Sequence, residues 1–137
     1  MRLVSYHTRD HSGVGVMVDD HRFVSLRRAA PDLPGTLKRI LELGPAVLKA
    51  IEAAAKGRDP DFRFDQVTLD PVVPEPHATW ALALNFKAHI EETGLTTSKD
   101  YPQIFMRMPC SVVGHLEPLW CPDPRVAETF DYEGELA

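Results

Sequence analysis

Residues 2–26 read RLVSYHTRDHSGVGVMVDDHRFVSL, and this stretch decides the fold of the first part of the chain. It alternates short apolar runs with two segments of turn-forming residues, His11-Ser12-Gly13 and Asp19-Asp20-His21. The apolar runs lie at residues 3–6, 14–18 and 22–26. Short strand-forming runs separated by such turns are typical of antiparallel hairpins, so we predict a β-meander here.

Two short amphipathic helices are predicted to follow the meander. In the first, behind Thr36, apolar residues recur at i, i+3 and i+4: Leu37, Ile40 and Leu41. In the second, behind Pro45, the same spacing is kept by Val47, Leu48, Ile51, Ala54 and Ala55. Gly44 separates the two helices and Gly57 ends the second. We expect both apolar stripes to face a common core.

A strand is expected over residues 62–69, and a proline-rich segment follows it. Pro71, Pro74 and Pro76 disfavour both a helix and the interior of a sheet. We therefore place a domain boundary in this segment. Residues 1–77 are predicted to form a small α+β domain that ends in the linker 71–77, and residues 78–137 begin a second domain.

The second domain is predicted to open with a buried strand at Trp80 to Leu84, because this run is short and apolar. About two turns of helix are expected over residues 86–93. Residues 102–107 are then expected to form a strand that enters a loop at 108–111.

The composition is that of an ordinary soluble globular protein, with 44% apolar and 26% charged residues in 137. The length suits one domain, or one small domain with part of another. Fifteen basic and twenty acidic side chains give a net charge of -5, and no basic run is long enough to follow a phosphate backbone. We expect no nucleic acid partner, and an anionic substrate would need individual Arg or Lys side chains, or a metal ion.

The two cysteines, Cys110 and Cys121, match no metal-site spacing, and we expect reduced thiols. The N-terminus lacks the apolar segment of a signal peptide, and no stretch approaches the roughly 20 apolar residues of a membrane span. A cytoplasmic location without membrane association is the resulting expectation.

His89 and Glu92 are the first candidates for chemistry. On a helix they would lie three residues apart on one face, where a carboxylate can orient an imidazole that acts as a general base. An exposed His and Glu on a polar helix face is the commoner outcome of such spacing. Their place after a buried strand favours the catalytic reading, because binding loops often gather there. The other histidines, which show no partner spacing, are expected on the surface or in loops: His7, His11, His21, His77 and His115.

The acidic end of the chain is the candidate metal site. In a strand, Asp131, Glu133 and Glu135 would point to one face, and their oxygens suit Mg²⁺, Mn²⁺ or Ca²⁺. The alternative is the solvated face of an edge strand. Two glutamates alone are too few for Mg²⁺, so at least one further protein ligand is expected.

Several motifs, taken in order, resemble the fumarylacetoacetate hydrolase family. They are Asn85-Phe86-x-x-His89-x-x-Glu92, Pro102-x-x-Phe105-x-Arg107, Ser111-x-x-Gly114 and Asp131-Tyr132-Glu133-Gly134-Glu135-Leu136. The resemblance covers most of residues 78–137. This chain has Arg107 where family members usually have Lys, and Phe86 where they usually have Tyr.

The resemblance implies a catalytic domain with a mixed β-sandwich roll that usually forms a dimer. It implies that Glu133 and Glu135 hold a divalent metal, Mg²⁺ first, with a third ligand beyond Ala137. It also implies a catalytic pair, His89 and Glu92. The residues expected to bind substrate are Asn85, Arg107 and Ser111.

The predicted function is that of a metal-dependent hydrolase that cleaves a C–C bond in a small anionic 2-oxo or β-diketo acid. Decarboxylation, tautomerisation and hydration are alternatives on the same family skeleton. A non-catalytic interaction domain, in which the acidic strand pairs with another chain, is the alternative from another class. We further expect the chain to be the N-terminal portion of such an enzyme. It would then associate with the remaining portion, or with itself, and be inactive alone.

Overall fold

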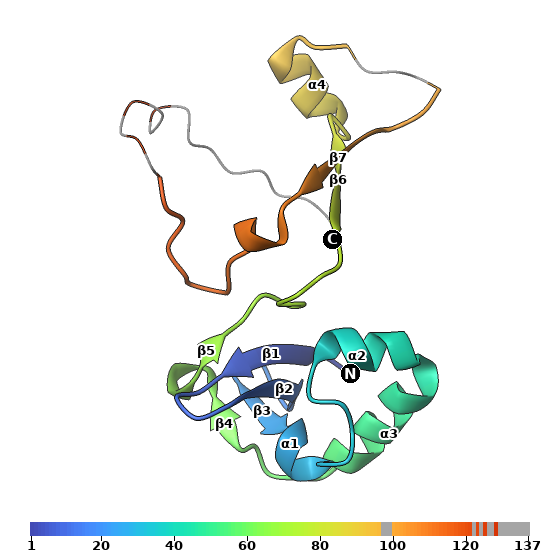
Figure 1. The fold of residues 1–137 in the computed structure, drawn as a ribbon, viewed down its shortest axis with the longest axis vertical. Helices are drawn as coiled ribbons and strands as arrows, with labels where there is room; N and C mark the ends of the chain where they lie inside the picture. The colour runs from blue at the N-terminus through green and yellow to red at the C-terminus, as the bar shows by residue number, and fades with distance from the viewer. Residues whose placement is uncertain (97–99, 122, 124, 126–127, 129–137) are drawn as a thin grey trace.

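The computed structural model describes residues 1–96, 100–121, 123, 125 and 128, and its architecture is mixed α+β (Figure 1). The predicted meander is confirmed as β1 (Leu3–His7), β2 (Ser12–Met17) and β3 (Arg22–Ser25). These strands pair antiparallel inside a five-stranded sheet of order β4-β3-β2-β1-β5. The chain enters α1 (Leu26–Ala29) directly after β3, so Leu26 begins a helical turn and does not extend the strand.

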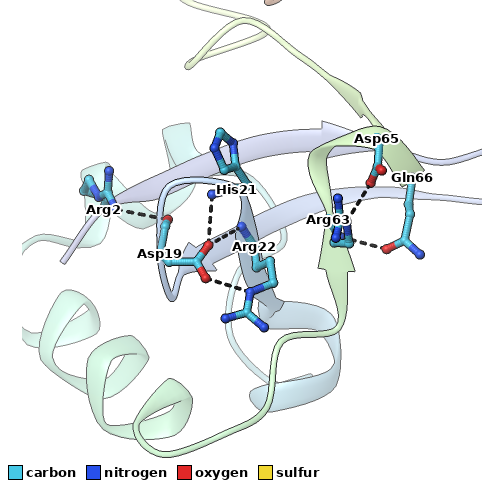
Figure 2. Close-up of polar contacts among 7 residues, drawn as sticks. All are labelled: Arg2, Asp19, His21, Arg22, Arg63, Asp65 and Gln66. Carbon is cyan, nitrogen blue, oxygen red and sulfur yellow. Dashed lines mark hydrogen bonds and ion pairs between the residues drawn. The ribbon is translucent and has the colours of Figure 1, made fainter.

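The turn between β2 and β3 is fixed by Asp19, which Figure 2 shows in detail. One carboxylate oxygen of Asp19 accepts the backbone N–H of His21 at 2.9 Å and that of Arg22 at 2.8 Å. The other oxygen accepts Nε of Arg22 at 2.6 Å. Arg2 donates to the Asp19 carbonyl at 3.0 Å, which joins this turn to the segment before β1. The side chain therefore supplies acceptors that the tight turn cannot provide from its own backbone.

Both predicted helices are confirmed as α2 (Leu37–Leu43) and α3 (Pro45–Ala55). The hydroxyl of Thr36 caps α2 by accepting the N–H of Arg39 at 3.4 Å. Gly44 separates the helices with φ 78°, a conformation that glycine adopts without steric cost. The two helices share one apolar core with the sheet, in which Ile40 and Ile51 are fully buried.

The single strand predicted over residues 62–69 is wrong. The segment splits into β4 (Phe62–Arg63), a 3₁₀ turn η1 (Phe64–Gln66) and β5 (Thr68–Leu69). β4 pairs with β3 and β5 pairs with β1, so the chain crosses from one edge of the sheet to the other. The side chain of Gln66 accepts the Arg63 N–H at 2.8 Å and stabilises the crossing turn (Figure 2).

The proline-rich segment has neither helix nor strand, as predicted. It lies against the first sheet, because the Ser5 hydroxyl donates to the carbonyl of Val72 at 2.7 Å. Val73 packs against the core that α2 and α3 share with β2. The placement of a domain boundary between residues 71 and 77 stays a prediction.

The later part of the chain forms a two-stranded antiparallel ladder with β6 (Thr79–Ala83) and β7 (Gln103–Arg107). α4 (Lys87–Thr93) and a 3₁₀ turn η2 (Pro109–Ser111) confirm the expected helix and loop. The expected burial of the first strand is wrong, since Trp80 is 67% exposed and Leu82 is 38% exposed. An antiparallel sheet usually packs one of its faces against a second layer of the protein. Among the described residues, no such layer covers this ladder.

Candidate active site

The strand β6 leads into α4 through a short turn at residues 84–86. Leu84 adopts φ 52°, in the left-handed region that a leucine rarely occupies. Asn85 follows it and α4 begins after Phe86, so the first candidate motif begins in this turn. α4 ends at Thr93 and is capped by Gly94, whose φ of 65° lies in the left-handed region. A strained residue beside a candidate site is a recurring feature of functional loops.

His89 and Glu92 lie on one face of α4, as their spacing predicted. The His89 Nδ1 atom is 3.8 Å from Oε2 of Glu92. The imidazole is 35% exposed and the carboxylate 78% exposed, so solvent reaches both groups. The Thr93 hydroxyl donates to the His89 carbonyl at 3.0 Å and closes the last turn of the helix. The distance allows an ion pair with a protonated imidazole, and a small rearrangement would make it a hydrogen bond.

The residues predicted to bind substrate are divided between two ends of the ladder. Asn85 follows the carboxyl end of β6, whereas Arg107 pairs with Thr79 at the amino end of that strand. The register places Thr79 and Ala83 four positions apart, which corresponds to about 13 Å along the strand. A molecule as small as a 2-oxo acid does not span this distance. The structure therefore pairs His89 with Glu92 on α4, places Asn85 just before that helix, and leaves Arg107 apart.

Arg107 and Ser111 each have a local partner. The guanidinium of Arg107 lies 5.5 Å from the ring centre of Phe105, a cation–π distance. The Ser111 hydroxyl donates to the Met108 carbonyl at 2.7 Å and closes η2. Both side chains would need to exchange these contacts before they could bind a substrate.

The predicted metal ligands Glu133 and Glu135, with Asp131, lie outside the described residues. Within the described parts of the chain, no group of three or more His, Cys, Asp or Glu side chains could hold a metal ion. The carboxylate oxygens of the two glutamates suit a hard divalent cation. Such an ion would also need ligands other than these two side chains.

Sequence reasoning missed one charged pair, formed by His7 and Asp70. Nδ1 of His7 lies 2.6 Å from Oδ1 of Asp70, with the carboxylate only 19% exposed. The pair lines a cavity of about 400 Å³ that Ser12, Lys38 and other residues also line. None of the predicted catalytic or substrate-binding residues is among them. The partners are 63 positions apart, so no spacing rule could have found them.

Three exposed carboxyl groups have a lowered pKa, and each is explained by its local partners. The pKa of Asp19 falls to about 2, first because of the hydrogen bond from the His21 backbone and then because of the Arg22 side chain. The guanidinium of Arg39 lowers the pKa of Glu42, and that of Arg125 lowers the pKa of Asp123. The hydrogen bonds and ion pairs that cause these shifts stabilise local turns and one helix face.

Comparison with known proteins supplies the class of the chain. Residues 78–137 match the family described as "Fumarylacetoacetate (FAA) hydrolase C-terminal", which covers the segment that carries every candidate catalytic and metal residue. Residues 78–137 therefore form a segment of the fumarylacetoacetate hydrolase type, and the predicted resemblance is confirmed.

Similar proteins carry a more particular description. The "Oxaloacetate tautomerase fahd2, mitochondrial" of Xenopus laevis is 25% identical over all of this chain and 43% of its own length. The "Oxaloacetate tautomerase Fahd2a, mitochondrial" of Rattus norvegicus is 30% identical over all of this chain and 44% of its own length. The chain thus spans less than half the length of these relatives. No helix among the described residues has the length and apolar character needed to cross a membrane.

Proposed function

We propose that this chain supplies the proton-transfer residues of an enzyme that interconverts the keto and enol forms of a small 2-oxo acid. The observation that carries the proposal is the pairing of His89 with Glu92 at 3.8 Å, on the helix that follows β6 inside the matched segment. The names of the Xenopus and rat relatives support an oxaloacetate-like substrate. Tautomerisation needs one group that removes a proton and returns it, and an imidazole can do both.

In this proposal His89 takes the proton from the carbon beside the substrate carbonyl. Nε2, the ring nitrogen that does not face Glu92, receives the proton, and Glu92 holds the resulting imidazolium in place. The same nitrogen returns the proton to the enolate oxygen, so that no atom is gained or lost. Asn85, which lies just before α4, would donate to a substrate oxygen at the same end of the ladder.

A divalent metal, Mg²⁺ or Mn²⁺, would be held by Glu133 and Glu135 with at least one further ligand. When bound, such an ion supplies positive charge that stabilises neighbouring substrate oxygens. The proposed substrate contact of Arg107 requires a closer approach to α4 than the ladder provides. A guanidinium nevertheless suits a second carboxylate on the substrate better than an amine does, because it binds carboxylates bidentately.

Hydrolysis of a C–C bond in a β-diketo acid is the second candidate. It passes through a related enolate, but it also requires an activated water, and His89 would have to deprotonate that water instead of the substrate. The relatives' names favour tautomerisation over this reaction.

We also propose that β6 and β7 form a contact with another chain or with further residues of the same domain. Exposed apolar side chains on this ladder support this, with Trp80 at 67% and Ile104 at 57% exposure. These two residues, with Ala81 and Leu82, line a hollow of about 410 Å³. A dimer through this surface and a cytoplasmic location remain proposals.

The test is a keto–enol assay of the 137-residue chain with Mn²⁺, and of a joined protein. The joined protein carries the segment of the Xenopus relative that follows its matched residues, fused after Ala137. We expect faster decay of the enol absorbance of oxaloacetate in the joined protein, and no cleavage of a β-diketo acid. A joined protein that binds Mn²⁺ but leaves the enol decay at the uncatalysed rate would refute the proposal. Cleavage of the diketo acid would favour the hydrolase.

A further inference from the structure

Gly114 makes an unusually close approach to the first sheet. It is buried, and a Cβ added to it would lie 2.1 Å from the backbone oxygen of Leu69. The same atom would lie 3.2 Å from the Leu69 carbonyl carbon and 3.4 Å from that of Asp70. The obstacle is backbone, which cannot rotate away as a flexible side chain can. No residue other than glycine fits this position without moving one segment from the other.

The segment that carries Gly114 is a closed turn. The Gly114 N–H donates to Oε2 of Glu117 at 3.0 Å, and the Glu117 N–H donates to the Gly114 carbonyl at 3.3 Å. Leu116 adopts φ 64° inside it and is 89% exposed. The left-handed residue and the two hydrogen bonds give residues 114–117, which we call the seating turn, a defined shape.

The surface that receives the seating turn is also fixed. The Asp70 N–H donates to the Ser5 carbonyl at 3.0 Å, and the Asp70 carboxylate contacts His7 at 2.6 Å. Both anchoring residues belong to β1, a central strand of the sheet next to β5. Figure 1 shows the chain after η2 returning toward β5 and the segment that follows it. The contact therefore joins two parts of the chain that are each held internally.

We infer that Gly114 is a positioning residue that seats the turn 114–117 on the Leu69–Asp70 backbone and so fixes the preceding loop. That loop carries Ser111, and β7 ends just before it at Arg107. Through this contact the first sheet determines where the segment with the predicted substrate-binding residues lies. The consequence for substrate binding rests on the proposed function, whereas the contact itself does not.

Gly114→Ala tests the inference, and Gly35→Ala is its matched control. An added Cβ at Gly35 meets nothing within 4 Å, and the residue does not have a positive φ. Backbone hydrogen exchange of the 137-residue chain is the readout. In Gly114→Ala we expect the backbone amides of residues 114 and 117 to exchange at least about tenfold faster. The reason is that loss of the contact with the Leu69–Asp70 backbone promotes local opening. In Gly35→Ala we expect these amides to exchange at the wild-type rate.

A second variant covers the case in which alanine at 114 prevents folding. Glu117→Ala adds no atoms at the contact, but it removes the acceptor of the Gly114 amide. It should also speed exchange in the seating turn and leave β2 and β3 unchanged. Wild-type exchange in a folded Gly114→Ala chain, or in Glu117→Ala, would overturn the inference.

The effect on substrate is measured separately, in the joined protein. If the seating turn positions Arg107 and Ser111, Gly114→Ala should raise KM several-fold and change kcat less. A joined protein that lacks turnover even with the wild-type residue at position 114 would contradict the proposed function. The exchange rates would still decide whether Gly114 seats the turn. A fall in kcat alone, with unchanged KM, would contradict the positioning role.

Discussion

The imidazole of His7, the last residue of β1, lies 2.6 Å from the carboxylate of Asp70, the first residue after β5. The Asp70 carboxylate is 19% exposed, so water screens this contact less than it screens the surface ion pairs. The pair fastens the end of β1 to the residue that joins β5 to the proline-rich segment. It also borders the surface on which Gly114 packs.

Asp70→Ala is expected to lower the free energy of unfolding by about 1–2 kcal/mol, because it removes a partly buried charged hydrogen bond. Asp65→Ala is the matched control. It removes a carboxylate from an exposed ion pair with Arg63, and it should cost less than about 0.5 kcal/mol. Urea unfolding measures both. Equal effects of the two substitutions would show that the His7–Asp70 contact stabilises the fold no more than an exposed ion pair does.

Gly15→Ala is expected to destabilise the first sheet by about 1–3 kcal/mol, because it overfills the core. A Cβ at this position would lie 2.3 Å from the ring of Phe23, which is fully buried. Gly13→Ala is the control on the same strand, since its Cβ would be 3.5 Å from Tyr6 in ordinary contact. Thermal unfolding of both variants decides the matter, and a Gly15→Ala melting curve like that of Gly13→Ala would contradict this packing.

The Asp19 carboxyl is expected to titrate with a pKa of about 2, well below its ordinary value of 3.8. The cause is chiefly the hydrogen bond from the His21 backbone, followed by the Arg22 side chain. Because the folded pKa is the lower one, the stabilisation is complete above pH 3.8 and is lost as the pH falls through about 2. Carboxyl-carbon NMR titration measures this directly. A midpoint near 3.8 would mean that the turn bonds are absent in solution.

Glu133→Gln and Glu135→Gln are each expected to weaken binding of Mg²⁺ or Mn²⁺ to the joined protein, because each keeps the side-chain size but removes an anionic ligand. Glu128→Gln, a nearby carboxylate that the family motif does not include, is the control. Calorimetry reports the affinities. Unchanged affinity in both motif variants would remove these residues from the metal site.

The parts of the fold that sequence predicts well are those governed by neighbouring residues. Turn-forming segments separate the first three strands, and Thr36, Gly44 and Pro45 mark the helix boundaries. The split of residues 62–69 into two strands depends on which sheet edge each half meets, and that is a non-local choice. Intrinsic strand preference carries no such information.

The candidate site was predictable in part for the same reason. The spacing of His89 and Glu92 on a helix is local, and the structure shows it. The separation of Arg107 from α4 follows from the antiparallel register of β6 and β7, which the spacing of motifs along the chain does not reveal. The need for glycine at position 114 arises from a contact with Leu69, 45 positions earlier in the sequence, that no local pattern signals.

The central claim is that His89 moves the proton, and the most direct measurement is enol-to-keto turnover of oxaloacetate by His89→Ala in the joined protein. We expect the rate to fall by about 10²–10⁴-fold with nearly unchanged Mn²⁺ affinity, since the imidazole serves as the acid and base and not as a metal ligand. Glu92→Gln should lose less, because it removes only the partner that orients the imidazole. His77→Ala, which removes an exposed imidazole from the linker, should match the wild type. Turnover of His89→Ala within a factor of about two of the wild type would contradict the mechanism.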